Sequence, residues 1–277
     1  ILKDLYREKN EYEVSVNGRK CELNYTVISD VVKCSSCKST ESVWDFIVGE
    51  DLHTKKVAVC PKCNAKAKTS QLELEGSRPV FASYWEANSS GLKKIEITKA
   101  QAKHFESKIR RISSPISNVP VEKNREMYIR SALHLHQVSV VSDFYTPRNL
   151  SALTRLFERI QAVDDNRLRA ALMFAFTNTA WHGSKLRRYN SRGGHRPLTG
   201  TLYIPQLISE GNVFKIFSHK VDTLCSYYET LKKIATKGSV GISQCSALSL
   251  KHIKSKSIDY IFTDPPFGSN IFYADCN

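Results

Sequence analysis

The stretch Ile258-Asp-Tyr-Ile-Phe-Thr-Asp-Pro-Pro-Phe-Gly268 joins a short apolar run to a pair of prolines. The apolar run is typical of a buried strand, and two consecutive prolines permit neither a continuing helix nor regular strand pairing. We therefore expect the chain to leave a sheet at Asp264, at the carboxyl end of a strand, where open α/β sheets bind ligands. The simpler alternative is a proline-rich connection without a function.

The residues before this stretch predict helices followed by strands. Apolar residues recur at helical spacing over 147–160, 166–181 and 212–236, and Thr146-Pro147 marks the start of the first helix. The run Val240-Gly-Ile-Ser-Gln244 predicts a second buried strand. Helix, strand, short connector and strand in this order are typical of an α/β sheet.

The amino-terminal part predicts shorter elements. Two alternating apolar segments around Asn17-Gly18 indicate short strands joined by a turn. Residues 76–124 are polar and contain Ser89-Ser-Gly91 and two prolines, so we expect a connector that carries one short helix over 98–110.

Composition indicates a soluble globular protein. The chain has 277 residues, of which 41% are apolar and 25% are charged, and this length predicts one or two domains. No run approaches the roughly 20 apolar residues of a membrane-spanning helix, and no secretory leader is evident. We therefore expect a cytoplasmic protein without a membrane partner.

The net charge of +14 is unevenly distributed. Residues 1–90 hold 13 basic and 13 acidic side chains, so the whole excess lies in residues 91–277. Asp and Glu are absent from residues 166–209, where cations alternate with aromatic side chains. Clustered cations with nearby aromatic rings favour binding to nucleic acid, whose phosphates are negative and whose bases can stack. The alternative is a basic surface that only contacts solvent. The candidate nucleic-acid-binding residues are Lys185, Arg187, Arg188, Tyr189, Asn190, Arg192 and Arg196.

Two Cys-x-x-Cys pairs predict a metal site. Cys34-Ser-Ser-Cys37 and Cys60-Pro-Lys-Cys63 are separated by 22 residues, and two such pairs supply four thiolates to one tetrahedral zinc ion. Four cysteine ligands leave no open position for substrate, so the predicted zinc ribbon is structural. Between the pairs we expect a short hairpin formed by residues 42–48 and 55–59. A thioredoxin-like redox site would need only one pair.

Taken together, these motifs resemble a known family. Asp-Pro-Pro-Phe after an apolar strand resembles motif IV of bacterial DNA methylases that modify the exocyclic amino group of adenine or cytosine. The likeness extends over most of residues 20–277, and large members of the family also carry a zinc-ribbon insertion. The segments that carry it are Phe144-Tyr-Thr-Pro-Arg-Asn-Leu150, Lys185-Leu-Arg-Arg-Tyr-Asn190, Gly200-Thr-Leu-Tyr-Ile-Pro205 and Ser257-Ile-Asp-Tyr-Ile-Phe-Thr-Asp-Pro-Pro-Phe-Gly268.

The resemblance implies an S-adenosylmethionine-dependent DNA methyltransferase with a partial Rossmann-like sheet. Residues 1–90 would form the zinc-ribbon insertion region, and residues 91–277 part of the methyltransferase domain. Asp264 and the Pro265 carbonyl would orient the exocyclic amine toward the methyl donor. Pro266 would stiffen the turn, and Phe267 would stack on a base that has left the duplex.

The chain departs from the family pattern at the cofactor site. None of its twelve glycines forms a Gly-x-Gly, so the glycine-rich loop that holds S-adenosylmethionine is absent. Ser246 stands at the turn where the family often has an acidic cofactor contact. Because the sequence starts at Ile1 and stops soon after motif IV, we expect a fragment of a longer protein that is inactive when isolated.

Two other functions fit the same residues. Some tRNA guanine methyltransferases also use Asp-Pro-Pro followed by an aromatic residue, so RNA is an alternative substrate. A zinc-ribbon module that binds nucleic acid without catalysis is the non-enzymatic alternative. For the DNA methylase, restriction or phage-defence proteins are possible partners.

Overall fold

The computed structural model describes residues 1–8, 11–55, 57–86, 91–106, 119–234, 239–246 and 248–265. These residues form a mixed α/β structure whose strand pairs are all antiparallel. The main sheet has the order β7-β6-β2-β10-β8-β9, and β1 and β3 also pair with β2. Its strands are β1 (Glu13–Val16), β2 (Arg19–Lys33), β3 (Thr40–Ser42), β6 (Glu73–Glu86), β7 (Lys93–Glu96), β8 (Arg187–Arg188), β9 (Arg196–Pro197) and β10 (Leu207–Gly211).

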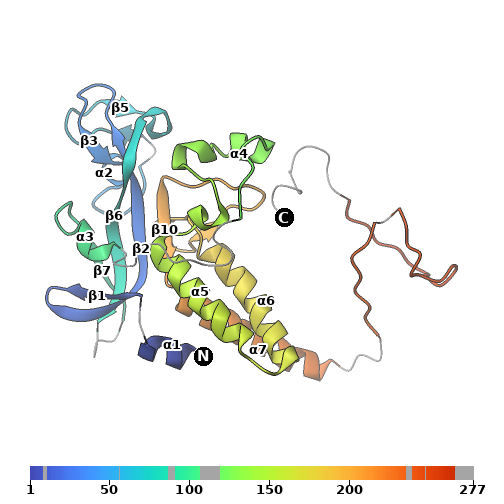
Figure 1. The fold of residues 1–277 in the computed structure, drawn as a ribbon. Helices are drawn as coiled ribbons and strands as arrows, with labels where there is room; N and C mark the ends of the chain where they lie inside the picture. The colour runs from blue at the N-terminus through green and yellow to red at the C-terminus, as the bar shows by residue number, and fades with distance from the viewer. Residues whose placement is uncertain are drawn as a thin grey trace.

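Helices flank this sheet, and a separate small hairpin pairs β4 (Ala58–Val59) with β5 (Lys66–Ala67). Figure 1 shows α5, α6 and α7 beside one another and the cysteine-bearing segment at one end of the β2–β6 pair. No helix in the described ranges has both the length and the apolar character needed to cross a bilayer. The helices are α1 (Leu2–Glu8), α2 (Val43–Ile47), α3 (Ala102–Phe105), α4 (Glu126–Arg130), α5 (Pro147–Gln161), α6 (Asn166–His182) and α7 (Val213–Lys233), with 3-10 turns η1 (Thr69–Gln71), η2 (Leu133–His136) and η3 (Val141–Phe144).

The three long helices confirm the prediction from apolar spacing, and each begins at a side-chain cap. Thr146 accepts a hydrogen bond from the Asn149 N–H and precedes Pro147 at the first turn of α5. Asp165 caps α6 and Asn212 caps α7, each through two backbone N–H groups of the first turn. These caps satisfy donors that a helix leaves without an internal partner.

The predicted amino-terminal hairpin is also confirmed. Strands β1 and β2 pair in register around Asn17 and Gly18, whose φ values are 50° and 78°. Two consecutive residues with positive φ are typical of the two-residue turn that matches strand twist. In the connector, α3 covers part of the helix expected over 98–110, and residues 107–110 of that prediction lie outside the described residues.

The two strands predicted after α7 are not formed. Residues 239–246 and 257–265 have no regular secondary structure, and their apolar side chains face solvent, with Ile242 95% and Phe262 82% exposed. This segment extends away from the helices in Figure 1. A strand gains stability only from neighbours that complete its hydrogen bonds and bury its side chains. No strand of the described chain pairs with these residues, so their apolar side chains are not buried.

The sheet joins residues that are distant in sequence. Strand β2 pairs with β6 on one side and with β10 on the other, so strands from both sides of residue 90 lie in one sheet. Tyr12 adds a second long-range connection because its buried hydroxyl donates to Asn149 Oδ1 (2.8 Å) and accepts from the Val213 N–H (3.0 Å). This single hydroxyl therefore holds together the starts of α5 and α7.

We expect Tyr12→Phe to lower the free energy of unfolding by about 1–3 kcal/mol, because it leaves buried polar groups without a partner. Urea unfolding of the variant and the wild type measures this difference. Tyr227→Phe, at an exposed tyrosine of α7, is the matched control and should change the stability little. Equal stability of both variants would contradict a structural role for the Tyr12 hydroxyl.

Candidate metal centre and nucleic-acid interface

Each Cys-x-x-Cys pair occupies the turn of a short hairpin. Cys34–Cys37 lies between β2 and β3, and Cys60–Cys63 lies between β4 and β5. The two turns have the same backbone hydrogen bonds. The first cysteine N–H donates to the residue five positions on, and its carbonyl accepts from the residue four positions on, at 2.8–3.0 Å. Lys38 and Asn64, which follow the second cysteines, both have positive φ. Because the two turns share this backbone conformation, each presents its two cysteine sulfurs on the same side of the chain.

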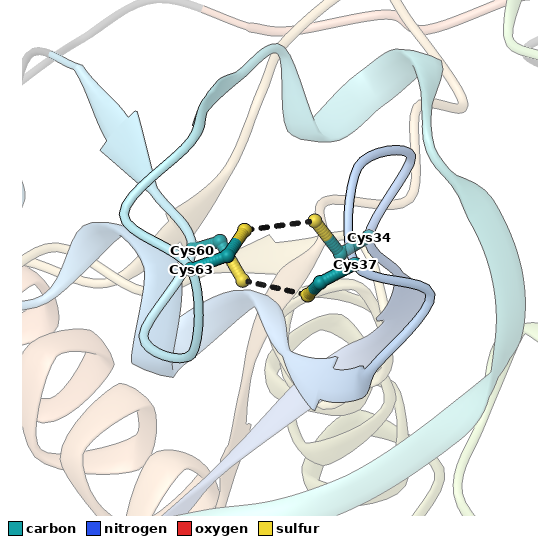
Figure 2. Close-up of side chains that lie close together, drawn as sticks. All are labelled: Cys34, Cys37, Cys60 and Cys63. Carbon is teal, nitrogen blue, oxygen red and sulfur yellow. Dashed lines mark hydrogen bonds between the residues drawn. The ribbon is translucent and has the colours of Figure 1, made fainter.

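The four sulfurs converge on one point. Figure 2 shows the two pairs facing each other, with the Cys34 and Cys63 Sγ atoms 3.9 Å apart and the Cys37 and Cys60 Sγ atoms 3.8 Å apart. All four Sγ atoms lie within 4.8 Å of one another. A Zn–S bond of about 2.3 Å places the sulfurs of a tetrahedral site about 3.8 Å apart. The cluster can therefore hold a zinc ion, as the spacing predicted.

The surroundings favour a thiolate at Cys37 but a protonated thiol at Cys63, whose pKa is raised to about 11. Hydrogen bonds from the side chain and backbone of Ser39 lower the pKa of Cys37 to about 6, and the Ser39 Oγ to Cys37 Sγ distance is 3.1 Å. Cys34 and Cys60 are buried in an apolar cluster. A four-sulfur site with two buried ligands stabilises the fold and offers no position for a substrate.

The hairpin predicted between the two pairs is wrong over residues 42–48. Residues 43–47 form helix α2 because Ser42 and Asp45 make a capping box, in which each side chain bonds the other residue's backbone N–H. This helix places Trp44 in the apolar cluster of the cysteines. The centroid of the Trp44 ring lies 5.4 Å from the ring centroids of both Phe81 and Tyr189. Trp44 therefore connects the cysteine cluster to β6 and to the residue that follows β8.

Three of the candidate nucleic-acid-binding residues are withdrawn from solvent. Tyr189 is only 6% exposed, and its ring packs against Trp44, so it is a core residue here. The Lys185 ammonium donates to the Asp143 carbonyl at 2.7 Å, and burial lowers the Lys185 pKa. Arg187 donates to the carbonyls of His195 and Ser209, and burial lowers its pKa to about 10.

The other four candidates remain accessible. Arg188, Asn190, Arg192 and Arg196 are exposed on β8, β9 and the turn between them. Beside this turn lies a hollow of about 360 Å³, lined by Arg192, Asn190 and Lys94 together with the rings of Tyr25 and His195. Asp51 and His53, from the segment between the cysteine pairs, line its other side. The fold thus brings cations and aromatic rings together where a nucleic acid can reach them.

Sequence reasoning missed His195, which organises this hollow. Its ring stacks on Tyr189 with 5.3 Å between centroids and meets the edge of Tyr25 at 4.6 Å. His195 Nδ1 accepts a hydrogen bond from the Asn190 N–H at 2.9 Å. Burial and the charge of Arg187 lower the His195 pKa to about 4, so the ring is neutral at pH 7. Its position in a Gly-Gly-His turn between two arginines was the only available signal.

Of the predicted catalytic and cofactor residues, the structure describes Asp264, Pro265 and Ser246. Asp264 and Pro265 are exposed in the extended segment, and Pro266 and Phe267 lie outside the described residues. Ser246 is exposed, and its Oγ accepts a hydrogen bond from the nearby Leu248 N–H at 3.2 Å.

Comparison with protein-family models, curated proteins and solved structures finds no match for this chain.

Purified protein should contain about one zinc ion per chain, and Cys60→Ser should lose it, because three ligands hold zinc far more weakly than four. Metal analysis and thermal unfolding with and without a chelator measure the effect, and we expect a lower melting temperature on chelation. Cys225→Ser, at an exposed cysteine of α7, is the control. Wild-type protein that is metal-free after expression in zinc-supplemented medium would contradict the assignment.

Proposed function

We propose that this chain is part of an S-adenosylmethionine-dependent DNA methyltransferase that acts on the exocyclic amino group of adenine or cytosine. The proposal is carried by the sequence Asp264-Pro265-Pro266-Phe267 directly after an apolar, strand-like run. Its resemblance to motif IV and the additional family-like segments support the reaction type. The cysteine cluster supports a DNA-binding role for the described part. So do the exposed residues Arg188, Asn190, Arg192 and Arg196 of β8, β9 and the turn between them, which we call the basic turn.

In this proposal Asp264 and Pro265 act on the amine of the target base. An aromatic amine is a weak nucleophile because its lone pair is delocalised into the ring. Hydrogen bonds from the amine to the Asp264 carboxylate and the Pro265 carbonyl favour a pyramidal nitrogen with a directed lone pair. A ring contact with Phe267 is expected to contribute about 1–3 kcal/mol to binding of the base.

The exposed run before Asp264 is consistent with a strand that requires further sheet neighbours. Ile258, Tyr260, Ile261 and Phe262 are all more than half exposed, which is costly for apolar side chains in water. We propose that these residues form a strand that pairs with further strands of a Rossmann-like sheet in the methyltransferase. There Asp264 would stand at the carboxyl end of a buried strand.

The exposed residues of β8, β9 and their turn are proposed to contact DNA. Arg188, Arg192 and Arg196 can neutralise phosphates, while the hollow with Tyr25 and His195 offers rings to an unstacked base. Arg187 and Tyr189 then act from within, because both contact His195 in this turn, while Lys185 holds the preceding residues to Asp143.

A nucleic-acid-binding module without catalysis is the second candidate. The observation that favours it is that Trp44 packs both in the apolar cluster of the cysteines and against Tyr189 next to the basic turn, whereas Asp264 is exposed in a segment without regular secondary structure. A methyltransferase that acts on RNA remains a variant of the first proposal, and methyl acceptance by DNA and by tRNA distinguishes the two.

Asp264→Ala in the full-length protein should abolish transfer of a labelled methyl group to DNA, because the amine loses its main acceptor. Asp259→Ala removes an exposed carboxylate five residues earlier in the same segment and should leave the activity near the wild-type value. If both variants are as active as the wild type, the catalytic assignment is wrong. If the wild type binds DNA but transfers no methyl group, the binding module is supported instead.

Arg192→Gln and Arg196→Gln should each weaken duplex DNA binding and reduce the slope of log affinity against log salt by about one. Fluorescence anisotropy at several salt concentrations measures both quantities. Arg167→Gln, at an exposed arginine of α6 outside β8 and β9, serves as the control. An equal effect of all three substitutions would point to non-specific attraction by the overall charge.

A further inference from the structure

A cavity of about 530 Å³ lies on the face of β2 that points away from the cysteine cluster. Alternate residues of β2 form its floor, namely Thr26, Ile28 and Asp30, whereas Val27 between them packs with the cysteines. This alternation follows from the two-residue period of a strand. The cavity and the metal centre therefore use opposite faces of the same strand.

Strand β10 extends the floor. Glu210 lies opposite Thr26 and Ile208 lies opposite Ile28 in the antiparallel register, and both line the cavity. Phe105 and Pro147 add apolar surface from α3 and α5. The cavity thus combines an apolar middle with oxygen-bearing side chains along its floor, at a size typical of sites for small molecules.

Two polar groups on this floor have no partner within the described chain. Thr26 is 1% exposed, and its Oγ1 makes no hydrogen bond. Asp30 is 5% exposed, and none of the described residues donates a hydrogen bond to its carboxyl group. A buried polar group without a partner is costly, and a buried carboxylate is especially so. The Thr26 Oγ1 is closed off even from the cavity, whereas Asp30 keeps some accessible surface, so a molecule that occupies the cavity can supply the missing donor to Asp30.

Most of the other charged side chains of the cavity are paired within the protein or stand at its rim. Glu210 pairs with Arg148 and Arg78 pairs with Asp45, although the buried Arg78 Nε makes no hydrogen bond. Lys185 donates to the neutral carbonyl of Asp143 and therefore keeps its positive charge. Asp30 and the exposed rim residues Glu75 and Glu106 outnumber this one cation, which favours a positively charged occupant over an anion.

We infer that this cavity binds a small organic cation, an amine or guanidinium with a short apolar body. The cationic N–H groups would donate to the Asp30 carboxylate, and the apolar body would pack on Ile28, Ile208 and Phe105. Charge-assisted hydrogen bonds of this kind are stronger than neutral ones. The inference rests on the cavity alone and is independent of the proposed methyl transfer.

The protonation of Asp30 gives the inference a pH signature. Burial raises the Asp30 pKa to about 7, so the empty cavity holds a largely neutral acid at acidic pH. Among the other titratable groups near Asp30, burial lowers the pKa of His136 and of Lys185, and Glu210 is paired with Arg148. Burial and the Asp30 carboxyl raise the pKa of Tyr203, so Lys185 is the cation of this group. A cation favours the ionised acid, so binding should tighten from about pH 6 to about pH 8.

The raised pKa of Asp30 also predicts how the stability of the protein without a ligand changes with pH. An acid whose pKa is higher in the folded state than in the unfolded state destabilises the fold as pH rises between the two values. Stability should therefore fall from about pH 4 to about pH 7, and Asp30→Asn should remove part of that fall. Urea unfolding across this range measures both.

The test uses 1-butylguanidinium as the probe and its neutral isostere 1-butylurea as the control ligand, with binding followed by amide chemical shifts in NMR. We expect butylguanidinium to shift the amides of residues 26–30 and 208–210, and butylurea to bind at least about tenfold more weakly. Equal binding of both ligands, or shifts confined to other regions, would overturn the inference.

Two variants complete the design. Asp30→Asn should weaken butylguanidinium binding without lowering the melting temperature, because it removes a polar group that has no partner in the empty cavity. Asp222→Asn, at an exposed carboxylate of α7, should change neither binding nor stability. A marked loss of stability in Asp30→Asn would show that Asp30 has protein partners, and the inference would then be wrong.

Discussion

The pairing of β2 with both β6 and β10 is the constraint on which the rest of the structure depends. This strand is fifteen residues long, and its two neighbours come from distant parts of the chain. One face of β2 supports the apolar cluster that contains Cys34, Cys60 and Trp44. The other face carries Thr26 and Asp30 into the cavity. A shift of one residue in register would exchange these two faces, so the register determines both sites at once.

Local signals were enough to predict the elements that local chemistry stabilises. Thr146, Asp165 and Asn212 each cap the helix that follows, α5, α6 and α7 respectively. The Asn17-Gly18 turn needs only two residues with positive φ. The cysteine pairs belong to the same class, because each Cys-x-x-Cys turn is closed by its own backbone hydrogen bonds. The capping box at Ser42 was also readable from sequence, but the apolar run that follows it favoured a strand.

Prediction failed where the outcome depends on distant neighbours. The apolar runs at 240–244 and 258–263 have the composition of buried strands, yet a strand forms only when a sheet receives it, and none does so in the described chain. Tyr189 and Arg187 were assigned to a surface because composition counts charges and rings without showing which side of a segment faces inward. The cavity was equally invisible, since it depends on the placement of Glu210 opposite Thr26.

The two faces of β2 also lie toward regions of opposite charge. The chain is strongly basic overall, and three of its accessible arginines, Arg188, Arg192 and Arg196, lie on β8, β9 and their turn, where they can meet phosphates. The lining of the cavity on the other face includes several carboxylates, and burial opposes the ionisation of Asp30. A polyanion attracted to the basic turn gains nothing from the cavity, and a small cation held beside Asp30 gains nothing from the turn. Trp44 connects the cysteine cluster to the basic turn, because it packs with the cysteines and its ring contacts Tyr189 next to that turn. The metal centre can therefore position the cationic surface without touching a ligand, while the opposite face stays free for different chemistry.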